Sequence, residues 1–157
     1  EVALVALPVE GWTVALTGSW NKTEVDDLTA SEAAISGAVL GAPLAGPEFS
    51  GSLRVNYEWF PTSTVTGNAS LAISHVGGYP NAFPNTPGKL PTFDEVDSYT
   101  FVNGTVAFAF DHYVVGAYVE NLFDDKSVNY VHPEAFIDGR YGRVRPRTIG
   151  IRLSYEY

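Results

Sequence analysis

The sequence predicts an all-β fold, an antiparallel up-and-down meander of about seven strands of the kind that lines a membrane β-barrel. Three observations predict it. Several strand-length segments alternate between apolar and polar residues. The connections between these segments alternate between short and long. Trp12 and Trp20 bracket one apolar face, and at about 3.3 Å per residue they stand about 26 Å apart, close to the height of the apolar band of an outer-membrane barrel.

Composition bounds the function. The chain has 157 residues and no cysteine, so disulfides and thiolate metal sites are excluded. A formal net charge of -9 argues against a nucleic-acid partner, which needs a basic surface. No apolar run is long enough for a transmembrane helix. The chain opens at Glu1 directly in an apolar stretch, so we expect either a removed signal or a piece of a longer protein.

The first two strands are expected on either side of a tight turn. Residues 1–8 form an apolar run that ends in a turn at Pro8–Gly11, where proline and glycine mark the reversal. Residues 12–24 then alternate, with Trp12 and Trp20 on the apolar side. A strand with two different faces separates two different media.

A long connection over residues 26–47 contains the one helix that we expect. Thr29 is its predicted N-cap, and Glu32 three residues later completes a capping box. Gly41 and Pro43 are its predicted stop signals.

The middle of the chain alternates again over residues 49–60 and 65–73, which are joined by a short turn at 61–64. The face of the first segment that carries Arg54 and Glu58 is too polar for a dry core. Residues 77–97, with four prolines, form a second long loop.

The last three strands are expected at residues 98–110, 113–122 and 148–157. Asp111–His112 is a two-residue turn, and residues 123–147 form a third long loop rich in charge and aromatic side chains. In the final segment the odd-numbered residues from Ile149 are apolar and the even-numbered ones are polar or small. Short and long connections therefore lie at opposite ends of the meander, as in outer-membrane barrels with short periplasmic turns and long outer loops.

Two motifs near the C-terminus resemble a known family. Residues 119–125 (VENLFDD) and 145–150 (RPRTIG), followed by the alternating terminal strand, resemble the last two strands of TonB-dependent outer-membrane receptors. Residues 8–12 (PVEGW) and 41–47 (GAPLAGP) resemble turn and loop stretches of the same family. The similarity covers nearly the whole chain.

The resemblance implies a bacterial outer-membrane transporter with a barrel of about 22 strands that encloses an N-terminal plug. Residues 1–157 would be the C-terminal segment of this barrel, without the plug and the earlier strands. The implied partners are outer-membrane lipid, the plug and upstream strands, TonB, and a scarce nutrient, foremost a ferric siderophore. No enzymatic activity, cofactor or bound metal is implied.

Candidate functional residues fall into three sets. Aromatic, histidine and arginine side chains in the outer loops suit an anionic, partly aromatic ligand: Tyr79, Phe83, His132, Phe136, Arg140, Tyr141 and Arg143. Polar residues of the strands are expected to face the barrel lumen, toward water and plug: Arg54, Asn56, Glu58, Tyr118, Glu120 and Arg152. Aromatic residues are expected in girdles at the membrane interfaces: Trp12, Trp20, Trp59, Tyr113, Tyr155 and Tyr157.

No catalytic or metal motif stands out. Asp124 and Asp125 follow Asn121 in a strand-end pattern, and we expect a turn in which these side chains satisfy backbone groups. The three histidines, at positions 75, 112 and 132, lack the spacing of metal ligands. There is no nucleophile elbow and no phosphate loop.

Two alternatives remain open from the residues alone. One is a soluble all-β ligand-binding module, such as a carbohydrate-binding domain with its long loops as the site. The other is a small, complete outer-membrane barrel of about eight strands. The first would pack its apolar strand faces against a second layer of the same chain.

Overall fold

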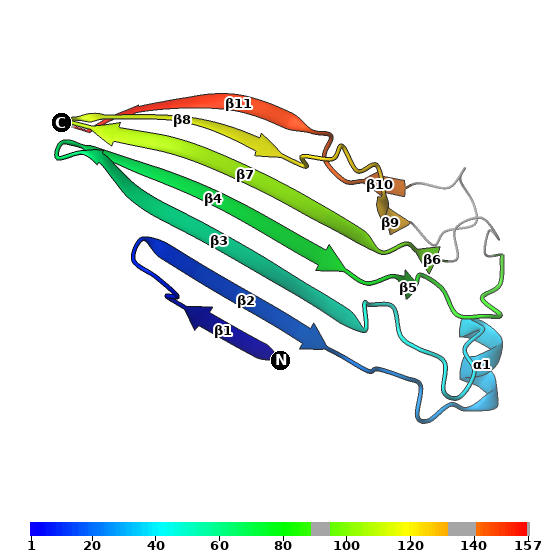
Figure 1. Ribbon diagram of the computed structural model, residues 1–157. Coiled ribbons are helices and arrows are strands. Elements are labelled where there is room, and N and C mark those ends of the chain that lie inside the picture. Colours follow the sequence, from blue (N-terminus) through cyan, green and yellow to red (C-terminus); the bar gives the residue numbers. More distant parts are fainter. Residues whose placement is uncertain (89–94, 132–140, 157) are drawn as a thin grey trace.

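A computed structural model describes residues 1–88, 95–131 and 141–156. Within these ranges the long strands form a single antiparallel sheet, seen in Figure 1 as one curved layer. Its seven strands are β1 (Val2–Ala6), β2 (Trp12–Trp20), β3 (Phe49–Thr62), β4 (Val65–Val76), β7 (Tyr99–Phe110), β8 (Tyr113–Glu120) and β11 (Thr148–Tyr155).

The sheet is a meander. Its strand order is β1-β2-β3-β4-β7-β8-β11, so each long strand pairs with the long strands that precede and follow it in the chain. β1 and β11 are the two edges and do not pair with each other, so the described residues form an open sheet and not a closed barrel. The predicted all-β, up-and-down fold is confirmed.

Register places most of the large apolar residues of the seven strands on one face. Leu16 of β2 stands opposite Leu4 and Leu53, and Leu53 stands opposite Ile73 of β4. Residues paired across an antiparallel ladder point to the same face, so these rows are continuous. One position further along, Thr17 pairs with Ser52, which pairs with Ser74, and this row belongs to the polar face.

The apolar face is uncovered. Leu16, Val115 and Leu153 are 45%, 37% and 70% exposed, and no second layer of the described chain lies over them. Most of the buried apolar residues lie in or beside the long connections and not on this face. Within the described part of the chain they are Ala38, Ala42, Val96, Val102, Val131 and Val144. The soluble-module alternative, which needs a second layer packed on this face, is therefore not supported.

The expected helix is present as α1 (Ala30–Ser36). Its capping box forms as predicted: the Glu32 amide donates to Thr29 Oγ1 at 3.3 Å, and the Thr29 amide donates to Glu32 Oε2 at 2.8 Å. Its predicted end at Gly41 is wrong, because the helix stops at Gly37, which adopts the left-handed conformation with φ of 71°. Only glycine enters this conformation without strain, so Gly37 ends the helix first.

The predicted strand ends differ from the observed ones by a few residues. β2 ends at Trp20 and not at Glu24, whereas β3 extends to Thr62 and β4 to Val76. Two of the long loops also contain short antiparallel pairs: β5 (Tyr79–Pro80) with β6 (Glu95–Val96), and β9 (Val128–Val131) with β10 (Tyr141–Arg143). Pairing within a loop satisfies its backbone groups, but segments this short leave no detectable period.

The two ends of the sheet are unlike. The short turns lie at one end together with the C-terminal end of β11, and α1, β5, β6, β9 and β10 lie at the other end (Figure 1). The predicted one-ended placement of the long loops is thus confirmed for the described residues. Among them, no helix has both the length and the apolar character needed to cross a membrane.

Candidate functional site

The polar face carries all six residues predicted to line a lumen. Arg54 lies between Ala15 and Ala72, and Arg152 is opposite Gly116. Asn56, Glu58, Tyr118 and Glu120 follow the same alternation on β3 and β8. Hydroxyl side chains fill much of the surface between them, among them Thr13, Thr17, Ser50, Ser52, Ser70, Ser74, Thr105 and Thr148.

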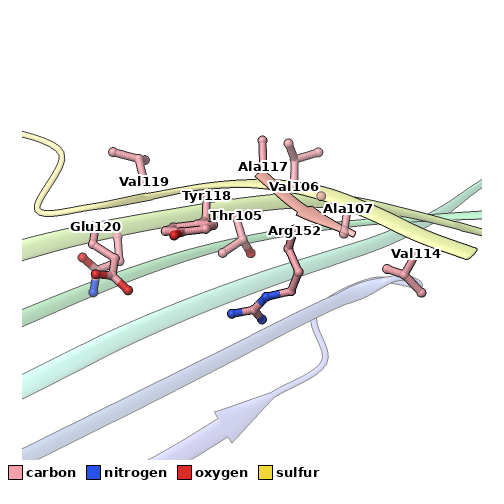
Figure 2. A pocket seen from close by; sticks show the side chains of 11 residues that line it. Thr105, Val106, Ala107, Val114, Ala117, Tyr118, Val119, Glu120 and Arg152 are labelled. Carbon is pink, nitrogen blue, oxygen red and sulfur yellow. The ribbon is translucent and has the colours of Figure 1, made fainter. Parts of the chain in front are cut away.

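Figure 2 shows this alternation near β8. Thr105, Tyr118 and Arg152 point to one side of the sheet, whereas Val106, Ala117 and Val119 point to the other. An open hollow of about 340 Å³ lies here, with Tyr118, Glu120 and Arg152 among its lining residues. The surface is therefore hydroxyl-rich and amphoteric, which suits contact with water and polar protein groups.

The Tyr118 ring lies flat across the backbone of the neighbouring strand. A Cβ added at Gly150 would come within 2.5 Å of Cζ and Oη of Tyr118. Glycine at position 150 therefore makes the space in which the ring rests. Sequence parity places both residues on the polar face, but it does not reveal their contact.

Charges on this face are sparse. Glu120 Oε2 forms an ion pair with Arg145 Nη1 at 3.2 Å at the loop end of β8. Among the described residues, Arg54 and Arg152 form no ion pair and point from the middle of the sheet toward the open side. These two unpaired guanidinium groups are available for an acidic partner or for water.

Two aromatic residues that the sequence pattern did not bring out also lie on the polar face. Tyr99 and Phe101 pair with Val76 and Ser74, and their rings meet edge to face with centroids 5.2 Å apart. Tyr99 and Phe101 are odd-numbered residues of β7, as Asn103 is. The alternation along β7 could therefore have placed them on the polar face. They form an aromatic surface at the loop end of β7.

The described loop residues of the predicted ligand set lie at this same end. Tyr79 belongs to β5, and Phe83 lines a hollow of about 230 Å³ together with Pro43 and Asn81. In β10, the guanidinium carbon of Arg143 lies 5.2 Å from the centroid of the Tyr141 ring, a cation–π geometry. Three further predicted ligand residues lie outside the described residues: His132, Phe136 and Arg140.

The three long connections contact one another. The Asn85 amide donates to the Gly37 carbonyl at 3.0 Å, and Thr86 Oγ1 donates to the Ser36 carbonyl at 3.1 Å, which docks the end of α1 on the second loop. β6 of the second loop lies beside β9 of the third (Figure 1). The loop end is thus a connected layer in which residues from three connections meet.

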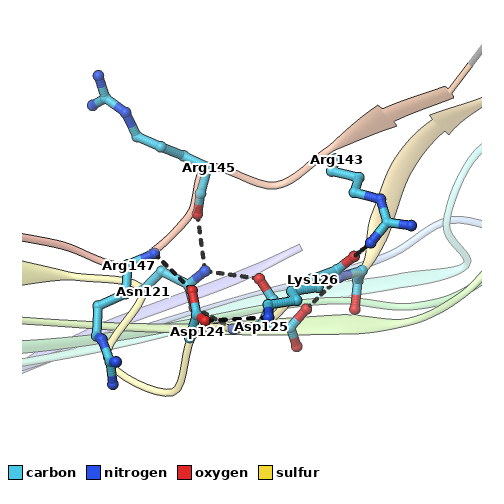
Figure 3. Close-up of polar contacts among 8 residues, drawn as sticks. Asn121, Asp124, Asp125, Lys126, Arg143, Arg145 and Arg147 are labelled. Atoms are coloured by element: carbon cyan, nitrogen blue, oxygen red, sulfur yellow. Dashed lines mark hydrogen bonds and ion pairs between the residues drawn. The ribbon is translucent and has the colours of Figure 1, made fainter.

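The strand-end pattern at 121–125 forms a hydrogen-bonded turn, as predicted (Figure 3). The Asn121 side chain accepts from the Asp125 amide and donates to the carbonyls of Asp125 and Arg145, each at 2.9 Å. Asp124 Oδ1 accepts from the Arg147 amide at 3.1 Å. This backbone hydrogen bond is the main reason why the pKa of Asp124 lies below its ordinary value, with nearby Lys126 and Arg147 adding to the effect.

Aromatic rings of the predicted girdles gather at both ends of the apolar face. At the short-turn end, Trp12 stacks on Tyr57 with centroids 4.6 Å apart, and Tyr57 stacks on Trp59 at 5.4 Å. Further along the same end, Tyr113 lies 5.1 Å from Tyr155. Tyr157 lies outside the described residues.

A smaller group of aromatic rings lies at the loop end of the apolar face. Trp20 lies 4.9 Å from Phe49, and Phe49 lies 5.9 Å from the ring of His75, centroid to centroid. His75 Nδ1 also shares a hydrogen bond with Thr100 Oγ1 at 2.9 Å.

His112 stands beside Asp111 in the β7–β8 turn. The described residues contain no group of three or more potential metal ligands.

Comparison with solved structures relates this sheet to two iron-uptake receptors. The chain matches the ferric yersiniabactin uptake receptor FyuA from Yersinia pestis with a TM-score of 0.75 and 18% identity, over 96% of this chain and 22% of the receptor. It matches the ferric-catecholate import receptor Fiu from E. coli K12 with a TM-score of 0.72 and 16% identity, over 99% of this chain and 20% of the receptor. No family model and no curated protein sequence matches the chain.

These similarities concern the fold. The chain spans about a fifth of the length of each receptor that it matches. At this level of identity they confirm the predicted architecture: an antiparallel sheet that superposes on part of the barrel of each receptor, the fold that the motifs at 119–125 and 145–150 resemble.

Proposed function

We propose that this chain is the C-terminal part of the β-barrel of a TonB-dependent receptor that imports a ferric siderophore across the bacterial outer membrane. One observation carries the proposal: a single sheet with one continuous, uncovered apolar face and one polar face superposes almost entirely on two ferric-siderophore receptors. A soluble protein has no reason to leave such a face open to water, whereas lipid covers it without cost.

The aromatic rows support a membrane position for the apolar face. Trp12 and Trp20 belong to rows at opposite ends of β2, and the strand rises about 26 Å between them. We assign Trp12, Trp59, Tyr113 and Tyr155 to one head-group layer and Trp20 to the other, because amphipathic rings favour that depth. Tyr157 is assigned to the first layer because it is an odd-numbered residue of the terminal segment, as Tyr155 is.

The free edges support a larger barrel. β1 and β11 each present one unpaired row of backbone groups, which is unfavourable in lipid and needs neighbouring strands. The shares of 22% and 20% of the two receptors leave room for those strands and for a plug. In this arrangement Arg54, Asn56, Glu58, Tyr118, Glu120 and Arg152 face the lumen and meet plug and water.

The loop end supplies the ligand surface in this proposal. Tyr79, Tyr99 and Phe101 offer aromatic faces and edges, and Arg143 over Tyr141 offers a cation, a combination that suits an anionic chelate with aromatic groups. Transport then consists of loop capture, rearrangement of the plug by TonB, and passage along the polar face. No covalent step is needed, so the protein is a transporter and not an enzyme.

A test uses the complete gene product in its host. We expect it in the outer-membrane fraction, and we expect deletion of the gene to abolish uptake of radio-iron from at least one ferric chelate, with ferric catecholate and ferric yersiniabactin as the first probes. Deletion of TonB should have the same effect.

Recovery of the protein from the soluble fraction would contradict the membrane assignment and favour a soluble binding module. Outer-membrane location with unchanged uptake of ferric chelates, but lost uptake of an oligosaccharide, would keep the fold and overturn the ligand class.

A further inference from the structure

The root of the third long connection is held by a buried polar residue. Asn121 follows β8 and is only 4% exposed, and it is the only buried polar residue among those described. Its backbone adopts the left-handed conformation with φ of 51°. Few side chains other than asparagine tolerate this conformation while also offering both a donor and an acceptor.

Every polar group of Asn121 has a partner. Its Oδ1 accepts from the Asp125 amide, and its Nδ2 donates to the carbonyl of Asp125 and to that of Arg145. Its own amide donates to Asn103 Oδ1 on β7 at 2.9 Å, and its carbonyl accepts from the Asp124 amide. The Asn121 side chain thus joins the segment after β8 to the segment before β11. The Asn121 amide joins the same root to β7.

Further bonds close the same root. Asp124 accepts from the Arg147 amide, and Glu120 pairs with Arg145. One step outward, the Val144 amide donates to the Ser127 carbonyl at 3.1 Å. Beyond this point lies the β9–β10 pair, which carries Tyr141 and Arg143. The bonds around Asn121 thus lie between this pair and the sheet (Figure 3).

We infer that Asn121 is a positioning residue: by closing the root of the third loop it holds the β9–β10 pair rigidly on the sheet and so presents Tyr141 and Arg143 for ligand capture. The ligand role rests on the proposed function. The fixing of the β9–β10 pair does not, and it can be tested separately. Asn121 touches no ligand in this account and acts through the loop that it closes.

Two substitutions separate the side-chain bonds from the backbone shape. Asn121→Gly keeps the left-handed conformation and removes all three side-chain bonds. Asn121→Asp keeps the acceptor for the Asp125 amide but removes both donors, so that a carboxylate faces two carbonyl oxygens. Asn21→Asp is the matched control, since it makes the same chemical change at an exposed asparagine at the same end of the sheet.

The first measurement is hydrogen–deuterium exchange on the complete receptor in detergent. We expect protection of the amides in Val128–Val131 and Tyr141–Arg143 to fall about tenfold or more in both Asn121 variants, because a buried network loses its bonds. Protection in β3 and β4 should stay unchanged, and Asn21→Asp should match the natural protein. Unchanged protection of the β9–β10 pair in both variants would overturn the inference.

A pH series gives a signature that general destabilisation would not. The introduced carboxyl faces two carbonyl oxygens, so its pKa should be raised, and its protonation as the pH falls restores one donor. Protection in Asn121→Asp should then recover toward that of the natural protein, while Asn121→Gly should not recover. Glu120, Asp124, Asp125, Lys126, Arg145 and Arg147 surround the site in both variants, so a difference between the variants isolates the introduced group.

The second measurement is binding of a ferric catecholate to the same proteins. If the natural protein binds it, both Asn121 variants should bind about tenfold more weakly, with the maximal uptake rate less affected than the affinity. Lost protection with unchanged affinity would overturn the positioning role. If the natural protein binds no ferric chelate, the proposed ligand is wrong, and the exchange experiment alone decides whether Asn121 holds the β9–β10 pair.

Discussion

At the scale of single residues, glycines make space for aromatic rings that lie flat on the sheet. Gly150 lies under the ring of Tyr118 on the polar face, and Gly67 lies under the ring of Trp59 on the apolar face. In each pair a Cβ at the glycine would overlap the ring. These rings shield the backbone of the neighbouring strand, which offsets the loss of a side chain at the glycine.

Replacement of Gly150 by alanine should therefore lower the free energy of unfolding by about 1–3 kcal/mol, the usual cost of overpacking. Removing the ring as well, in Gly150→Ala with Tyr118→Ala, should cost less than the sum of the two single changes. Urea unfolding of the complete protein measures the free energy of unfolding of all three variants. Gly104→Ala is the control, because its added Cβ would meet Val119 at 3.5 Å and the Ser70 carbonyl oxygen at 3.9 Å, both ordinary contacts; an equal loss there would contradict the clash.

At the scale of elements, the start of α1 could be predicted from sequence and its end could not. The capping box between Thr29 and Glu32 is local, so four consecutive positions reveal it. The end is set by Gly37, whose backbone lies against Asn85 of another loop. The same limit explains the missed pairs β5–β6 and β9–β10, which depend on how the loops meet and not on a repeating pattern.

Gly37→Ala should undock α1 from the second loop. Both Gly37 and Gly41 have a left-handed backbone, so alanine introduces similar strain at each, about 1 kcal/mol. At Gly37 the new Cβ would also overlap the Asn85 carbonyl group, whereas at Gly41 nothing lies within 4 Å. Exchange of the Asn85 amide, which bonds to Gly37, should rise sharply in Gly37→Ala and change little in Gly41→Ala. Similar exchange in both would show that docking does not depend on this contact.

At the scale of the whole molecule, alternation and connection length predicted the two faces, the meander and the one-ended loops. Each depends only on the period of two and on connection length, which a sequence displays directly. The position of Tyr99 and Phe101 on the polar face was not predicted, because aromatic residues on a polar face break the expected alternation. The contacts among the three long loops were not predicted, because no local sequence signal encodes them.

The two faces should differ in their tolerance of charge. Leu16 lies midway between Trp12 and Trp20 on the apolar face, so Leu16→Arg should cost about 2–4 kcal/mol in a bilayer and reduce the amount of assembled protein. Thr17→Arg, one residue further on the polar face, should assemble normally. Unfolding in lipid vesicles and the yield of heat-modifiable protein in the outer membrane measure the difference. Equal tolerance at both positions would contradict a lipid-facing surface.

The meander also bears on how such a wall can change over time. Each long strand pairs only with its neighbours along the chain, and no ladder of the described residues joins distant segments of the sheet. A hairpin such as β3–β4 could therefore be duplicated or lost in one genetic event: β2 and β7, which flank it, would pair with new neighbours, and the ladders β1–β2, β7–β8 and β8–β11 would keep their partners. Barrels of different circumference are accessible from one another by such steps, and the loops that a hairpin carries are exchanged with it as a unit.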